Sequence, residues 1–197
     1  MQVRFELLDS SARILALFCL FMLVSGTPPI ARAQTSADEY QVKAAFLFHF
    51  AQLVAWPGGA LSAQDPTLNL CIFADEPGRQ ELQAAIEGKP IGNRVLHVRP
   101  LSRSQDLQGC NVLFLSLDEE RRQTAILKTL RGLPILTVGE TANFLSDGGI
   151  IRFHLDQDKI RFDISLDSAD SSHLTISSRL LLLASKVIRG NGTDGGR

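Results

Sequence analysis

The chain lacks the sequence signatures of the common catalytic and nucleotide-binding sites. It has no G-x-S-x-G nucleophile motif, no Walker loop and no G-x-G-x-x-G between a strand and a helix. Its four histidines, His49, His97, His154 and His173, show neither the H-x-H nor the H-E-x-x-H spacing of a zinc site. We therefore expect no enzyme activity, no cofactor and no metal.

The chain also lacks a surplus of positive charge and a long apolar run. Its 20 Lys and Arg against 21 Asp and Glu give a formal net charge of −1, which argues against a nucleic-acid partner. The apolar run at 14–24 is too short for a membrane anchor. Arginines precede this run and Ala31-Arg32-Ala33 follows it, which is the pattern of a secretory signal peptide. We predict a signal peptide over 1–33 and a mature chain that begins at Gln34.

Cysteine is scarce, since only Cys71 and Cys110 remain after that cleavage. In an exported protein this even count favours one disulfide, and two buried free thiols are the alternative. Cys71 is disfavoured as a nucleophile, because a thiol within a buried strand lacks the accessible, electropositive surroundings that lower the pKa of a reactive cysteine.

Short apolar strands alternate with amphipathic helices along most of the mature chain. We predict strands at 68–73, 94–101, 111–115 and 134–138, helices at 79–87 and 118–130, and a helical turn at 102–107. Asp118 and Gly132 are the expected caps of the second helix. This alternation indicates a mainly parallel sheet flanked by helices. We expect a single α/β domain over 34–190 and a flexible tail over 191–197.

The hydrophobic period then changes to two residues. Apolar and polar side chains alternate over 151–155 and 160–166, which predicts an antiparallel hairpin that turns at Gln157-Asp158. In that register Phe153 faces Phe162 across the two strands. A further amphipathic helix is predicted over 175–188.

The outward face of this hairpin is the strongest polar cluster in the sequence, with Arg152, His154, Arg161, Asp163 and Ser165. Arginines there could hold a carboxylate or phosphate through forked hydrogen bonds, so Arg152, His154 and Arg161 are candidate anion ligands. The alternative is a solvated sheet face with an Arg152–Asp163 cross-strand pair. We favour this alternative, because alternating charge on a strand is the ordinary way to face water.

The mature chain begins with an aromatic helix over 39–55. Phe46 and Phe50 share one arc of this helix, which we expect in the core, and proline ends the helix after Trp56. Phe48 projects to the opposite side. We predict that Phe48, with Leu47, lies at an interface with a second copy or with a partner protein.

A resemblance to a known family rests on three segments in order: EYQVKAAFLFHFAQLVAWP, LNLCIF and TVGETANFLSDGGIIRFHLDQDKIRFDISLDSADSSHLTISSRLLLLASKV. They resemble the YfiR-like family of bacterial periplasmic proteins from about residue 39 to 187. The shared features are the aromatic helix that ends in Trp-Pro, the Gly-Gly entry to the hairpin, and Ser-Ser-x-Leu-Leu near the end.

The resemblance implies a periplasmic, non-catalytic domain that acts by binding. The family's named member represses an inner-membrane diguanylate cyclase, YfiN, through that enzyme's periplasmic part, and release of the repression raises cyclic di-GMP and favours biofilm. For this chain the resemblance implies a membrane signalling protein as partner, and a homodimer as a further option. It also implies a structural Cys71–Cys110 bridge, without a second, redox-sensing bridge near the hairpin. The alternatives are a periplasmic sensor of a small anion and a hydrolase.

Overall fold

The computed structural model describes residues 30–62, 65–102 and 107–190 of the chain. Residues 1–29 of the predicted signal peptide, residues 103–106 of the turn predicted over 102–107, and the predicted tail lie outside the described residues. The described residues from Ser36 onward form one compact unit, and the architecture below is that of this unit.

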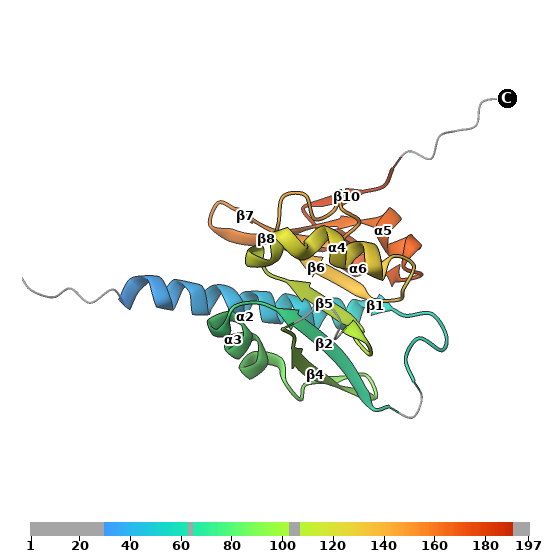
Figure 1. Ribbon diagram of the computed structural model, residues 1–197, viewed down its shortest axis with the longest axis horizontal. Helices are drawn as coiled ribbons and strands as arrows, with labels where there is room; N and C mark the ends of the chain where they lie inside the picture. Colours follow the sequence, from blue (N-terminus) through green and yellow to red (C-terminus); the bar gives the residue numbers. More distant parts are fainter. Residues whose placement is uncertain (1–29, 63–64, 103–106, 191–197) are drawn as a thin grey trace, which may run out of the picture. The chain divides into compact units, whose positions relative to one another are not determined.

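An eight-stranded sheet forms the centre of the fold, in the order β10-β8-β7-β6-β5-β2-β4-β3 (Figure 1). Its strands are β2 (Thr67–Phe73), β3 (Pro90–Ile91), β4 (Arg94–Pro100), β5 (Val112–Leu115), β6 (Leu136–Gly139), β7 (Ile151–Asp156), β8 (Lys159–Ser165) and β10 (Lys186–Ile188). The five central strands, from β4 to β7 in this order, run parallel. β3 is antiparallel to β4 and β8 is antiparallel to β7, whereas the edge strand β10 runs parallel to β8. The mixed, mainly parallel α/β fold with its C-terminal hairpin is therefore confirmed.

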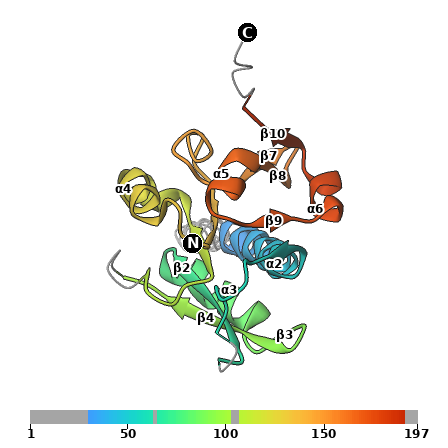
Figure 2. The same cartoon turned by 90° about the vertical axis from the view of Figure 1, so that its right-hand side faces the viewer.

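Helices cover both faces of this sheet. They are α2 (Ile30–Leu53), α3 (Glu76–Ile86), α4 (Glu120–Leu130), α5 (Leu166–Ser171) and α6 (Ser178–Leu183). Successive residues of β2 point to opposite faces, so Leu70 and Ile72 join the cluster around α2, whereas Cys71 and Phe73 join the cluster around α4. Figure 2 shows α4 and α2 on either side of the strands. Burial on both faces explains why the strands read as continuous apolar runs.

The aromatic residues of α2 pack on the hairpin. The Phe50 ring lies 4.9 Å from the ring of Phe162 and 5.6 Å from that of Phe153, between centroids. Leu47 is only 1% exposed and belongs to the same core, so its predicted place at an interface is wrong. Phe48 is half-buried, with the Lys89 ammonium 5.4 Å from its ring centroid.

The hairpin forms in the predicted register. Phe153 pairs with Phe162 and Arg152 with Asp163 across β7 and β8. The two loop residues, Gln157-Asp158, have φ of 48° and 58°, which is the left-handed pair of a type I′ turn. That turn matches the twist of the strands it joins, so the local pattern was sufficient to predict it.

The helix predicted over 175–188 is confirmed only at 178–183, and both of its ends are wrong. Thr175–Ile176 is instead β9, which pairs with β1 (Val54–Ala55) at the end of α2, and the helix begins only after Ser177. The Ser177 side chain accepts a hydrogen bond from the Leu180 N–H, which caps α6. After α6 the Ser185 N–H donates to the Phe162 carbonyl at 2.8 Å, and the chain continues as β10 along β8. Residues 186–188 therefore form a strand at the free edge of the sheet, although their sequence pattern is helical.

Two helix starts also differ from the sequence prediction. α3 begins at Glu76, before Pro77, because Asp75 caps it and proline is tolerated in a first turn, where N–H groups have no intrahelical partner. Asp118, the expected cap of the next helix, lies in a 3₁₀ turn at Leu117–Glu119, and α4 has no side-chain cap at Glu119. Gly132 does follow α4, with φ of 80°.

The Cys71–Cys110 disulfide is confirmed. Cys71 lies in β2 and Cys110 just before the neighbouring strand β5, with 5.7 Å between their Cα atoms. Both side chains are buried in the cluster around α4. The bridge therefore joins two adjacent parallel strands on one face of the sheet.

Replacing both cysteines by alanine should lower the unfolding free energy by about 3–4 kcal/mol, because the bridge closes a loop of 39 residues in the unfolded chain. Chemical denaturation of the wild type and of the Cys71→Ala/Cys110→Ala variant measures the difference. As a control, reductant should destabilise the wild type by a similar amount and leave the variant unchanged. Equal stabilities without reductant would contradict a structural role for the bridge.

Candidate functional site

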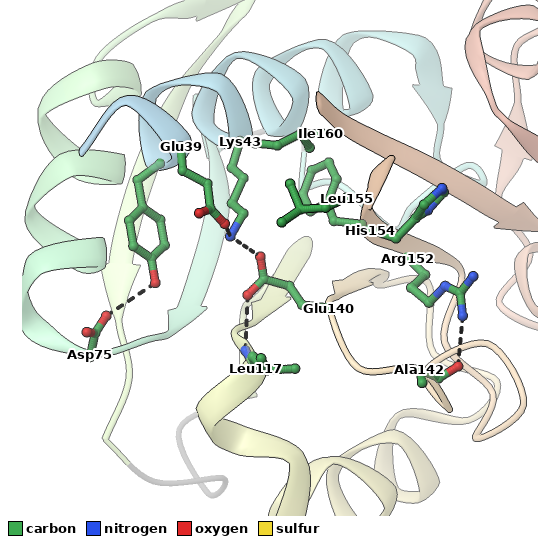
Figure 3. Close-up of a pocket in the computed structure, with 12 residues that line it drawn as sticks. Glu39, Lys43, Asp75, Leu117, Glu140, Ala142, Arg152, His154, Leu155 and Ile160 are labelled. Atoms are coloured by element: carbon green, nitrogen blue, oxygen red, sulfur yellow. Dashed lines mark hydrogen bonds and ion pairs between the residues drawn. The ribbon is translucent and has the colours of Figure 1, made fainter. Parts of the chain in front are cut away.

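A cavity of about 620 Å³ opens at the carboxyl ends of the parallel strands (Figure 3). Asp75, Leu117 and Glu140 line it, and they follow β2, β5 and β6 by one or two residues. The chain passes from β2 to β4 on one side of β2 and places β5 on the other side, so the strand order reverses here. In open α/β sheets this switch point is the usual place for a ligand.

Helix α2 and the hairpin complete the walls of the cavity. The helix contributes Glu39, Tyr40 and Lys43, spaced at three and four residues on one face. The hairpin contributes polar and apolar side chains, which are Arg152, Phe153, His154, Leu155 and Ile160. Figure 3 shows Lys43 and Glu140 turned toward each other, with Asp75 to one side of them and His154 and Arg152 to the other.

A buried lysine lies at the centre of this site. Lys43 is 6% exposed, and its Nζ pairs with the Glu39 Oε1 at 2.5 Å and with the Glu140 Oε1. The second carboxylate oxygen of Glu140 accepts a hydrogen bond from the Leu117 N–H at 3.0 Å. Burial raises the pKa of Glu140 above its usual value, and the Lys43 charge opposes this shift. One buried cation is therefore shared between two carboxylates.

Tyr40 connects the same helix to the start of α3. The Lys43 Nζ lies 4.8 Å from the centroid of the Tyr40 ring, and the Tyr40 hydroxyl donates to the Asp75 Oδ1 at 3.3 Å. A Cβ at Gly78 would lie 2.4 Å from the Tyr40 Cζ, so any other residue there would force the Tyr40 ring to move. Glycine at this position therefore allows the close approach of α3 to Tyr40.

The polar face of the hairpin is not the solvated face that we favoured from the sequence. Asp163 is only 4% exposed and accepts from the Arg152 guanidinium at 2.5 Å, so the predicted cross-strand pair forms but is half-buried. Arg152 also donates to the Ala142 carbonyl at 2.9 Å. Ser165 is buried and caps α5. Arg152 and His154 of this face line the cavity, and the loop after β6 contacts Arg152 through the Ala142 carbonyl, so only part of the face meets water.

The structure brings together only part of the predicted anion set. Arg152 and His154 line the cavity, and the His154 Nδ1 lies 3.6 Å from the Asp163 Oδ2. Arg161 is exposed and does not line the cavity. The Asp163 carboxylate already neutralises Arg152, so the arginine side of the site carries little free positive charge.

Sequence reasoning missed the residues at the centre of the site: Lys43, Tyr40, Asp75 and Glu140. Asp75 and Glu140 had a usable signal, since each follows a predicted buried strand by one or two residues. Lys43 had none, because a single lysine in an amphipathic helix is ordinarily a solvated residue.

Within the described ranges, no group of three His, Cys, Asp or Glu side chains is placed to hold a metal ion. Likewise, no helix among the residues with a described placement is long and apolar enough to cross a membrane.

The Glu140→Gln variant should lose part of the pH dependence of folding stability. Because the folded state raises the pKa of Glu140, its stabilising contribution is complete below the usual value of 4.5 and disappears as pH rises through the folded-state pKa. Relative to Glu140→Gln, the wild-type unfolding free energy should therefore fall as pH rises from about 4 toward neutrality. Denaturation at several pH values measures this.

The matched control is Glu120→Gln, which removes an exposed carboxylate of α4 and should follow the wild type. Parallel stability curves for the wild type and Glu140→Gln would show that burial does not perturb this carboxyl.

Two solved structures are similar to this chain at low sequence identity. One is a conserved domain protein from Vibrio cholerae O1 biovar eltor, with a TM-score of 0.48 and 9% identity over 74% of this chain. The other is the ABC domain in complex with L-Trp from Streptococcus pneumoniae, with a TM-score of 0.46 and 11% identity over 66% of this chain. The chain spans 60% and 57% of the lengths of these two proteins.

A family model described as YfiR/HmsC-like matches residues 40–185. The match begins at Tyr40 in the cavity wall and ends at Ser185, where the chain joins the edge of the sheet. It therefore includes every strand from β1 to β9, the disulfide and all cavity residues except Glu39. The chain belongs to the YfiR/HmsC-like family.

Proposed function

We propose that this chain is a periplasmic, non-catalytic regulator that binds and restrains an inner-membrane signalling protein such as a diguanylate cyclase. It would thereby lower cyclic di-GMP and limit biofilm formation. The observation that carries this proposal is membership of the YfiR/HmsC-like family over residues 40–185, which is most of the mature chain.

The chemistry of the cavity is consistent with binding rather than catalysis. Lys43 is paired with two carboxylates and Arg152 with Asp163, while Asp75 accepts hydrogen bonds from the Tyr40 hydroxyl and the Gly78 N–H. An acid–base catalyst instead needs a titratable group within reach of a substrate proton. The paired network favours a structural or recognition role for these side chains.

An exposed apolar surface lies at the C-terminal end of the domain. Leu182 in α6 is 86% exposed. Two residues that follow it in the chain, Leu183 in α6 and Val187 in β10, are also exposed. Among the described residues, β10 is also an edge strand, hydrogen-bonded in the sheet to β8 alone. Exposed aliphatic side chains next to a free strand edge are typical of protein–protein contacts. We assign contact with the membrane partner to this C-terminal apolar surface, defined by these three residues.

Deleting the gene should raise cellular cyclic di-GMP, and plasmid-borne wild type should restore the lower level. The Leu182→Asp variant should fail to restore it, because a carboxylate at the centre of an apolar contact must be desolvated on binding. The measurement is cyclic di-GMP in cell extracts, alongside capture of inner-membrane proteins on the mature chain.

The control is Leu133→Asp, which alters an exposed leucine after α4 and should restore the level fully. Unchanged cyclic di-GMP on deletion would contradict the regulatory proposal. Equal activity of the two variants would contradict only the choice of surface, provided that both are folded by circular dichroism.

Of the two residues predicted to form an interface on α2, Leu47 is buried and only Phe48 remains a candidate. We propose that Phe48 forms a self-association contact. Phe48→Ala should change the unfolding free energy by less than about 1 kcal/mol and weaken dimerisation, because a half-buried aromatic can contribute to binding more than to folding. Phe50→Ala is the matched core variant and should cost about 3–5 kcal/mol. Sedimentation and denaturation measure the two effects. Equal destabilisation by both variants would place Phe48 in the core.

A further inference from the structure

We propose that the cavity at the carboxyl ends of β2, β5 and β6 binds a small organic cation, a primary amine carried on an apolar ring or chain. This goes beyond the proposed regulation of a membrane partner and does not depend on it. The inference rests on the cavity's size, its apolar walls and the sign of its charge.

The size and walls of the cavity suit a small amphipathic molecule. Its volume of about 620 Å³ lies within the range of small-molecule pockets. Leu117 and Leu155 line it although they are 59% and 64% exposed, and Ile160 lies across the hairpin from Leu155. Figure 3 shows Leu155 and Ile160 on the same side of the Lys43–Glu140 pair. An apolar ligand body would cover these side chains and remove their surface from water.

The carboxylates that line the cavity outnumber its lysine and arginine side chains by three to two. Glu39, Asp75 and Glu140 face it, against Lys43 and Arg152. Both cations are already committed, Lys43 to two of these carboxylates and Arg152 to Asp163, which adds a further negative charge behind the wall. The surplus of negative charge therefore favours a cationic ligand. This is the opposite of the anionic ligand that the hairpin arginines suggested from the sequence.

The site already accommodates one ammonium group, that of Lys43. Its ammonium is held between carboxylates and lies over the Tyr40 ring, which is the arrangement that proteins use to bind amines. A ligand amine need not displace it, because Glu39 and Asp75 lie toward solvent, 40% exposed for the Glu39 side chain. The ligand ammonium would bind between these two carboxylates, while its apolar part extends toward Leu117 and Leu155.

The test uses three probes of similar size and different charge, titrated into the mature wild-type protein by calorimetry. They are 2-phenylethylamine, 2-phenylethanol and 3-phenylpropionate. The amine should bind about tenfold or more tightly than the alcohol, because a charge-assisted contact replaces a neutral one, and the carboxylate should bind most weakly. Equal binding of the three probes, tighter binding of the carboxylate, or no saturable amine binding below about 10 mM overturns the proposal.

Two isosteric variants locate the site. Glu39→Gln and Asp75→Asn each remove one charge and should weaken amine binding about tenfold, and asparagine still caps α3. Asp158→Asn in the hairpin turn is the control and should bind the amine as the wild type does. Thermal melts establish that each variant is folded. If folded Glu39→Gln and Asp75→Asn both retain wild-type amine affinity, the amine binds elsewhere and the proposal fails. Cyclic di-GMP regulation is a separate readout, so loss of either proposal leaves the other standing.

Discussion

The packing of α2 on the hairpin is the contact on which the rest of the molecule depends. The rings of Phe46 and Phe50 pack against those of Phe153 and Phe162, with centroid distances between 4.9 and 5.9 Å. This aromatic cluster fixes the helix across one face of the sheet, and aromatic pairs are worth more than their buried area alone. The same helix face, two turns earlier, carries Lys43. The cluster therefore determines where the buried lysine meets Glu140.

The order of the strands explains why the polar residues converge. The carboxyl ends of parallel strands lie at the same edge of a sheet. Asp75, Leu117 and Glu140 follow such ends and therefore lie close together, although they are far apart in the chain. Burial at this edge would leave charges without solvent, and the chain compensates by pairing Lys43 with Glu140 and Arg152 with Asp163. The result is a negative, largely apolar cavity rather than the arginine-rich surface that the hairpin sequence alone suggested.

Several elements could be predicted because their information is local. The type I′ turn at Gln157-Asp158 follows from two residues between alternating strands, and the pairing of Phe153 with Phe162 follows from the turn. The disulfide could be predicted because only two of the three cysteines lie outside the predicted signal peptide. The family could be predicted because its motifs extend over the whole domain in a recognisable order.

The sequence by itself thus determined the period of each strand, the hairpin register, the cysteine pair and the family. The tertiary structure decided the elements that depend on a distant edge or neighbour. Residues 186–188 become β10 because β8 presents unpaired backbone groups beside them, and this overrides their helical pattern. Asp163 is buried because the loop after β6, which holds Arg152 through the Ala142 carbonyl, lies on a hairpin face that would otherwise meet water. Burial and net charge at a site are sums over elements that meet only in the folded chain, so no local pattern contains them.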